Sequence, residues 1–162
     1  MKKITSIFLI SIMFSILLFI SGCNDEDTLT HVTDFEKKIQ TAVNTYRATK
    51  TLSAITLQFL MVDDAQGNSR KMADGTAPYS ANPTDEVMVN LTTLKNNLGG
   101  DDCAAVVQFS ESENADTIVN RIKRDPLKRE VIEGDFNQIG VGSAKQSATG
   151  KWYVTILLIH IP

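Results

Sequence analysis

The residue types that most often carry out catalysis are scarce in this chain. It contains two histidines, His31 and His160, and two cysteines, Cys23 and Cys103. A nucleophilic Cys103 would need one of the histidines beside it, because the imidazole must take the thiol proton. His31 stands in a polar segment and His160 at the end of a strand-like run, so we expect no such pair. Cys103 precedes the apolar run "AAVVQF" and is predicted to be a small, inert core residue.

The acidic residues offer no acid–base pair either. Asp63 and Asp64 are neighbours in the sequence, as are Asp101 and Asp102. Side chains of adjacent residues point in different directions on a helix or a strand. We therefore expect these carboxylates to be solvated and not to share a proton, and we assign no catalytic residue.

Two glycines one residue apart, in Gly140-Val141-Gly142, raise the question of a phosphate-binding loop. Such a loop needs a strand, a Gly-rich turn and then a helix whose N-terminus faces the anion. Here the following residues, "SAKQSATGKWYVTILL", have the pattern of a hairpin. In a strand, Gly140 and Gly142 share one face and allow a helix or a neighbouring backbone to approach closely. We predict strand glycines and no nucleotide.

The N-terminal segment has the composition of a leader. Lys2 and Lys3 supply positive charge, and residues 7–20 are almost wholly apolar. This run is shorter than the roughly 20 residues that a membrane-spanning helix needs. A charged start, a short apolar core and small residues after it are typical of a secretory signal peptide, here residues 1–22.

The end of this leader resembles the bacterial lipobox, in the stretch Ile20-Ser21-Gly22-Cys23. That resemblance implies a lipid on the Cys23 thiol and a lipid-anchored protein of the cell envelope, outside the cytoplasm. The alternatives are an ordinary signal peptide with a coincidental cysteine, or an uncleaved anchor. Residues 23–32 would then form an acidic tether; acids after a lipidated cysteine resemble surface-export signals of some Gram-negative lipoproteins, but a plain spacer is the interpretation that we favour.

The remaining chain has the size of one domain. Removing residues 1–22 removes two lysines and no acids, which leaves 140 residues with a net charge of −5. This length can bury a substantial core, and we assign residues 33–162 to it. The acidic balance argues against nucleic acid. Cys103 is the one cysteine left after lipidation of Cys23, so disulfides do not build this domain.

Hydrophobic periodicity predicts both helices and strands. A capping box, Thr33-x-x-Glu36, starts the first helix. Further helices are expected over residues 56–72, 85–98 and 113–124, a buried strand over 103–109, and a hairpin of strands 138–145 and 151–161. Because both faces of the last strand are largely apolar, helices must cover both sides of the sheet. The expected fold is an α+β, three-layer α-β-α sandwich with a mainly antiparallel sheet.

The order of these segments resembles the CAP superfamily, also called SCP-like, which is named for cysteine-rich secretory, venom antigen and pathogenesis-related proteins. The stretch Phe136-x-x-Ile139-Gly140-Val141-Gly142 is similar to the end of such a domain, and "VNTYRATKTL" to its first helix. "LMVDDAQGNSRKMA" resembles the second helix, and "IVNRIKRDPLKREVI" the family segment Trp-x-x-Ser-Pro-x-His-Arg. The resemblance spans residues 35–161.

The departures from the family decide the expected site. Members with a metal-binding cavity carry two histidines and acidic partners. The resemblance places Lys128 at one histidine position and the loop at Tyr79 and Ser80 at the other, while Asp102 could stand in for an acidic partner. These four residues are the candidate cavity. A lysine is normally protonated and repels a cation, so we expect no metal and no cofactor.

The resemblance implies a non-enzymatic binding module with a degenerate cavity. Its ligand would be apolar or lipid-like, or a protein partner from the envelope or a host, with the membrane bound through acylated Cys23. The alternative is a hydrolase that uses a non-standard residue set in the CAP cleft. A structural role in the envelope with no small ligand also stays open.

Overall fold

The computed structural model describes residues 31–162. The expected signal peptide, Cys23 and the tether as far as Thr30 lie outside the described residues, and they stay predictions. Val32, which the prediction left in the tether, is buried in the structure. Within residues 31–162, no helix has the length and apolar character needed to cross a membrane.

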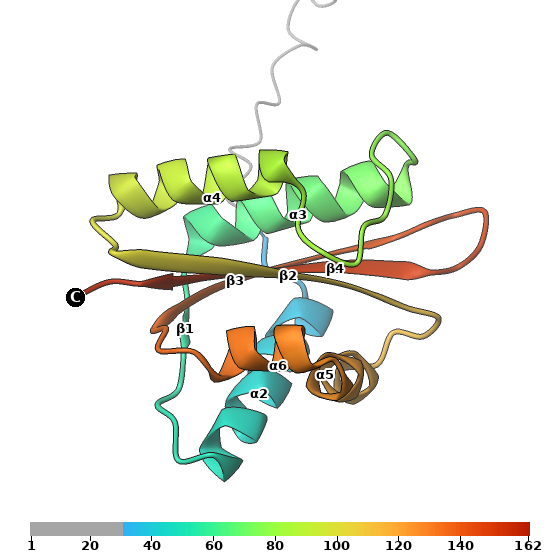
Figure 1. Ribbon diagram of the computed structural model, residues 1–162. Helices are drawn as coiled ribbons and strands as arrows, with labels where there is room; N and C mark the ends of the chain where they lie inside the picture. Colours follow the sequence, from blue (N-terminus) through green and yellow to red (C-terminus); the bar gives the residue numbers. More distant parts are fainter. Residues whose placement is uncertain (1–30) are drawn as a thin grey trace, which may run out of the picture.

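A four-stranded sheet forms the centre of the molecule, in the order β1-β3-β4-β2 (Figure 1). The strands are β1 (Thr56–Leu57), β2 (Asp102–Ser110), β3 (Gln138–Lys145) and β4 (Trp152–His160). β3 and β4 form the predicted antiparallel hairpin, and β2 pairs with β4, also antiparallel. The short β1 pairs in parallel with β3. The sheet is therefore mainly antiparallel, as predicted, with one parallel pair at its edge.

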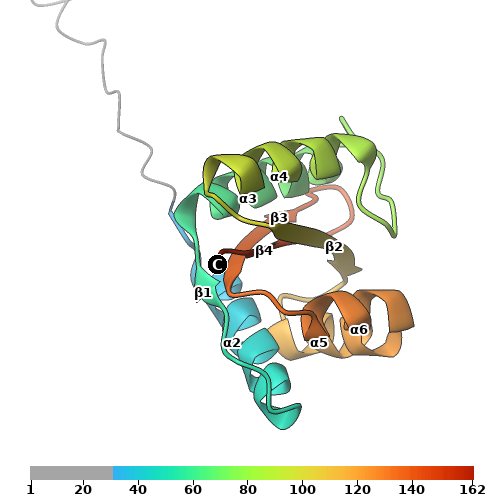
Figure 2. The same cartoon turned by 60° about the vertical axis from the view of Figure 1, so that its left-hand side comes forward.

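Helices cover both faces of this sheet (Figures 1 and 2). α3 (Phe59–Ala73) and α4 (Asp85–Asn97) lie on one face, and α2 (Asp34–Thr49), α5 (Ala115–Arg124) and α6 (Pro126–Glu133) on the other. A hydrophobic core lies on each face of the sheet, and alternate β4 residues point into one or the other. Ile156 and Leu158 pack toward α2 and α5, whereas Leu157 and Ile159 pack toward α3 and α4. The predicted three-layer α-β-α sandwich is confirmed.

Gly140 and Gly142 let α3 lie directly on β3. A Cβ atom on Gly140 would stand 2.4 Å from the Met61 backbone, and one on Gly142 would stand 2.1 Å from the Ala65 backbone. Real Cβ atoms do not approach a backbone this closely. The prediction of strand glycines is confirmed, and the hairpin that follows them provides no helix N-terminus for a phosphate.

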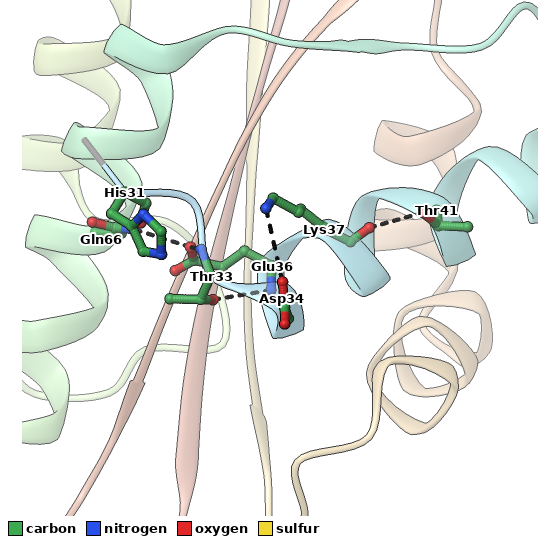
Figure 3. A network of polar contacts seen from close by, with 7 residues as sticks. All are labelled: His31, Thr33, Asp34, Glu36, Lys37, Thr41 and Gln66. Carbon is green, nitrogen blue, oxygen red and sulfur yellow. Dashed lines mark hydrogen bonds and ion pairs between the residues drawn. The ribbon is translucent and has the colours of Figure 1, made fainter. Parts of the chain in front are cut away.

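The start of α2 is held by a buried carboxylate (Figure 3). Thr33 and Glu36 form the predicted capping box, in which each side chain accepts a hydrogen bond from the other's backbone N–H. Glu36 also accepts hydrogen bonds from Gln66 of α3 at 2.9 Å and from the Ser143 N–H of β3 at 2.8 Å. One carboxylate therefore ties α2 to the layers above it.

The start of the second helix differs from the sequence prediction, and one further helix was not predicted. The second helix was expected from Thr56, but Thr56 and Leu57 pair with β3 and the helix begins at Phe59, after Gln58 as its N-cap. One helix was not predicted: α6 begins at Pro126, two residues after the end of the helix expected over residues 113–124. Proline at this position loses no helical hydrogen bond, and the Asp125 carboxylate caps the helix by accepting from two backbone N–H groups.

Candidate functional site

Three of the four candidate cavity residues lie near the C-terminal end of β2, Tyr79 and Ser80 on one face of the sheet and Lys128 on the other. Tyr79, from the loop between α3 and α4, packs edge-on against the Phe109 ring, with ring centroids 5.1 Å apart. Ser80 lines a small cavity together with Val107 of β2. The volume of this cavity is about 10 Å³, which is room for one water molecule at most. Tyr79, Lys128 and Asp102 do not line this cavity, so it is not formed by the four candidate residues together.

Lys128 reaches the same end of β2 from the opposite face of the sheet. Its side chain is buried, and its Nζ donates to the Val107 carbonyl at 2.8 Å and to Gln108 Oε1 at 3.1 Å. Burial lowers the pKa of the Lys128 ammonium, and the nearby Asp125 carboxylate opposes that shift. β2 is an edge strand, so its outward carbonyls need donors. Lys128 supplies one, and this fixes its amine in the fold.

Asp102 does not join the other candidate residues. It lies at the N-terminal end of β2, where its Oδ1 accepts from the Cys103 N–H. The seven residues from there to Phe109 span about 23 Å along a strand. The side chain that does face Lys128 is Gln108, which the sequence analysis missed. The sequence did contain a signal for this role, because Gln108 is a polar residue inside an apolar strand. In the structure Gln108 is 7 % exposed, so its side chain is buried where it meets Lys128.

Cationic side chains complete this end of β2. Arg121 of α5 donates to the Phe109 carbonyl at 3.0 Å, and its guanidinium lies 5.3 Å from the Phe109 ring centroid. Lys151 lies over the same ring at 5.5 Å. Burial raises the pKa of the nearby Tyr79 phenol, and Arg121 opposes that rise. The side chains at this end of β2 therefore supply hydrogen-bond donors to the carbonyls of an edge strand. Among these side chains, no nucleophile lies beside a base.

The remaining candidates for nucleophilic chemistry are separated. His160 pairs with Asp101 at 2.7 Å near the free end of β4; this contact raises the pKa of the His160 imidazole and lowers that of the Asp101 carboxyl. Cys103 packs on the α4 side, within 4.0 Å of Thr92. In β4, His160 is in phase with Ile156 and Leu158, so it projects from the other face. Among residues 31–162, no cluster of three potential ligands could hold a metal.

A wider opening is a groove between α2 and α5, with a volume of about 630 Å³. Its apolar surface comes from Ala42 and Tyr46 on α2 and from Ala115 and Val119 on α5. Lys123, at one side, lies 5.0 Å from the Tyr46 ring centroid. This groove was not predicted from the sequence, because it forms between two helices that are far apart in the chain. A smaller groove of about 220 Å³ separates α3 from α4.

The three layers and the helix that packs on two strand glycines are those of a CAP-type α-β-α sandwich. In agreement, residues 40–158 match the model of the cysteine-rich secretory protein family, CAP. The chain belongs to this family. A search among curated proteins found no significant match.

Solved structures of the same fold come from distant organisms. An outer surface protein from Borrelia burgdorferi superposes with a TM-score of 0.63 at 12% identity, over 82% of this chain and 99% of that one. An extracellular protein containing an SCP domain from Bacillus anthracis gives 0.64 at 16% identity, over 86% of this chain and 45% of that one. A venom allergen-like protein from Schistosoma mansoni gives 0.58 at 8% identity, over 80% and 90%. At such identities, the likeness concerns the fold alone.

Proposed function

We propose that this chain is a lipid-anchored CAP-domain protein of the cell envelope. In this proposal it is a non-enzymatic binding module that holds a lipid-like ligand in the groove between α2 and α5. The observation that carries the proposal is the open groove of about 630 Å³, which contrasts with the cavity of about 10 Å³ beside Ser80. Ligand sites usually have volumes of about 300–1,000 Å³, so the groove has the size for a small molecule and the cavity beside Ser80 does not.

The lining of the groove supports an amphipathic ligand. The apolar floor of the groove, formed by Ala42, Tyr46, Ala115 and Val119, suits a hydrocarbon chain. Its other lining residues include charges of both signs, Lys38 and Lys123 as well as Glu113 and Asp116, which suit a polar head group. At the cleft, Lys128 already donates to two protein oxygens and has no free role as an acid or a base. These features favour binding over the alternative of hydrolysis.

The envelope location rests on the leader and on the relatives. The lipobox-like stretch ending at Cys23 supports an anchor outside the cytoplasm. Of the similar structures, one is an outer surface protein and another an extracellular protein. Both descriptions are compatible with a protein tethered at the outside of a membrane.

A bulky side chain introduced into the groove tests whether the ligand binds there. Thr45 lies at its edge and donates to the carbonyl four residues earlier in α2. Thr93 on α4 makes the same hydrogen bond and lines no described groove, so Thr93→Trp is a matched control for Thr45→Trp. We expect a fluorescent fatty acid to bind the parent and Thr93→Trp alike, and Thr45→Trp at least tenfold more weakly. Equal affinity of all three proteins, or no binding by the parent, would contradict the proposal.

A further inference from the structure

Two large apolar side chains stand exposed next to each other at the start of α3. Phe59 is 60% exposed and Leu60 is 59% exposed. The other large apolar residues that are exposed within residues 31–162, Val89 on α4 and Leu127 on α6, each stand alone. Single exposed apolar residues are normal on protein surfaces; Phe59 and Leu60 differ in that two such residues share the first turn of one helix.

The chain enters the fold beside this pair. Gln66 of α3 donates to the His31 carbonyl at 3.1 Å and also to Glu36, so the first described residue is fixed on α3 (Figure 3). Gln66 follows Leu60 by six residues, which is about 9 Å along a helix axis. Figure 2 shows the described chain starting next to the N-terminal half of α3. Whatever precedes His31 therefore arrives near Phe59 and Leu60.

We propose that Phe59 and Leu60 seat the domain on the lipid bilayer that holds the acylated Cys23. This inference rests on the proposed lipid anchor. Eight residues, from Cys23 to Thr30, separate the anchor from the described chain, and eight residues reach at most about 29 Å. Such a tether keeps the pair at a high effective concentration near the bilayer, where aromatic and aliphatic side chains enter the interface between head groups and acyl chains.

The charges near the pair indicate the kind of lipid surface. Asp63 and Asp64 follow Phe59 and Leu60 by one helical turn and are both exposed. An anionic surface would repel them, so the expected partner is a zwitterionic bilayer. In this orientation the groove between α2 and α5 stays accessible from water, because it lies on the opposite face of the sheet from α3 (Figure 1).

Tryptophan scanning of the full-length, lipidated protein on zwitterionic phosphatidylcholine vesicles tests the seat. Phe59→Trp and Leu60→Trp probe the pair, while Val89→Trp and Leu127→Trp are matched controls at 63% and 68% exposure. Quenching by lipids with brominated acyl chains is measured for each variant, with the signal of the parent, which contains Trp152, subtracted. We expect the tryptophans at positions 59 and 60 to be quenched at least twice as strongly as those of the controls.

Equal quenching in all four variants would overturn the proposal that Phe59 and Leu60 seat the domain on the bilayer. A blue-shifted emission at positions 59 and 60 without quenching would also overturn it, because a second protein copy would then cover the pair. If the protein carries no acyl group and leaves the vesicles, the anchor and the seat both fail. If it is acylated and stays bound while positions 59 and 60 are unquenched, the seat alone fails.

Discussion

Buried charged side chains in this domain bind backbone groups of the fold. Arg47 on α2 is 1% exposed, and its guanidinium donates to the carbonyls of Ser53, Ile132 and Gly134. Lys128 does the same for the edge of β2. Isolated ions are costly to bury unless hydrogen bonds replace the lost water. These side chains therefore act as structural connectors between segments that are distant in sequence.

Glu36 is the acidic counterpart, and its removal should destabilise the domain. Each of its two oxygens accepts two hydrogen bonds, from Thr33 and Gln66 on one oxygen and from two donors of Ser143 on the other. In Glu36→Gln, an NH₂ group would face two of these donors. We expect the free energy of unfolding to fall by about 1–3 kcal/mol, the usual cost of leaving buried donors unpaired, as measured by chemical denaturation.

The matched control is Glu130→Gln on the exposed side of α6. Surface substitutions of this kind usually change stability by less than about 0.5 kcal/mol. If Glu36→Gln were no more destabilising than Glu130→Gln, the network in Figure 3 would not stabilise the fold as described.

The sequence predicted the site only in part, and the reason is physical. Lys128, Tyr79 and Ser80 were placed near one cleft by family spacing, and they lie around one end of β2. Asp102 was assigned to the same cavity, but strand geometry puts it at the other end. Which β2 carbonyls face outward depends on the pairing of β2 with β4. A local pattern does not contain that pairing, so the role of Gln108 was missed.

At the scale of elements, the contact between α3 and β3 gives a sharp prediction. Gly142→Ala would place a methyl group 2.1 Å from the Ala65 backbone, so the helix or the strand must shift. Overpacking of this kind costs about 1–3 kcal/mol, which we expect to lower the melting temperature by several degrees. The measurement is a thermal melt followed by circular dichroism.

Gly67, also on α3, is the matched control, because a Cβ there would meet nothing within 4 Å. Gly67→Ala should raise stability by about 0.5–1 kcal/mol, since alanine loses less entropy than glycine in a helix. A Gly142→Ala protein that melts with the parent, or together with Gly67→Ala, would show that the helix does not rest on the strand as described.

Elements with strong periodicity were predicted well, and those defined by tertiary context were not. The capping box at Thr33 and the hairpin around β3 and β4 carry local signals, and both are present. β1 is two residues long and exists only because it pairs with β3. α6 begins at Pro126 directly after α5, where proline ends one helix and starts the next.

At the scale of the whole molecule, the three layers separate two surfaces. α3 carries the exposed pair Phe59 and Leu60 beside the start of the described chain, and the groove between α2 and α5 lies across the sheet. A protein anchored through Cys23 and seated through α3 would therefore present its groove away from the membrane. The proposed contact of Phe59 and Leu60 with the bilayer depends on the anchor, whereas the proposed ligand site rests on the groove itself.

The anchor is tested directly by metabolic labelling with a clickable fatty acid in a bacterial host, comparing the parent with Cys23→Ala. We expect the parent to be labelled and to fractionate with membranes. The intact mass should correspond to a chain that begins at an acylated Cys23. In Cys23→Ala the label should be absent. An unlabelled parent, or a label that persists in Cys23→Ala, would contradict the claim that this CAP domain is a lipoprotein anchored through Cys23.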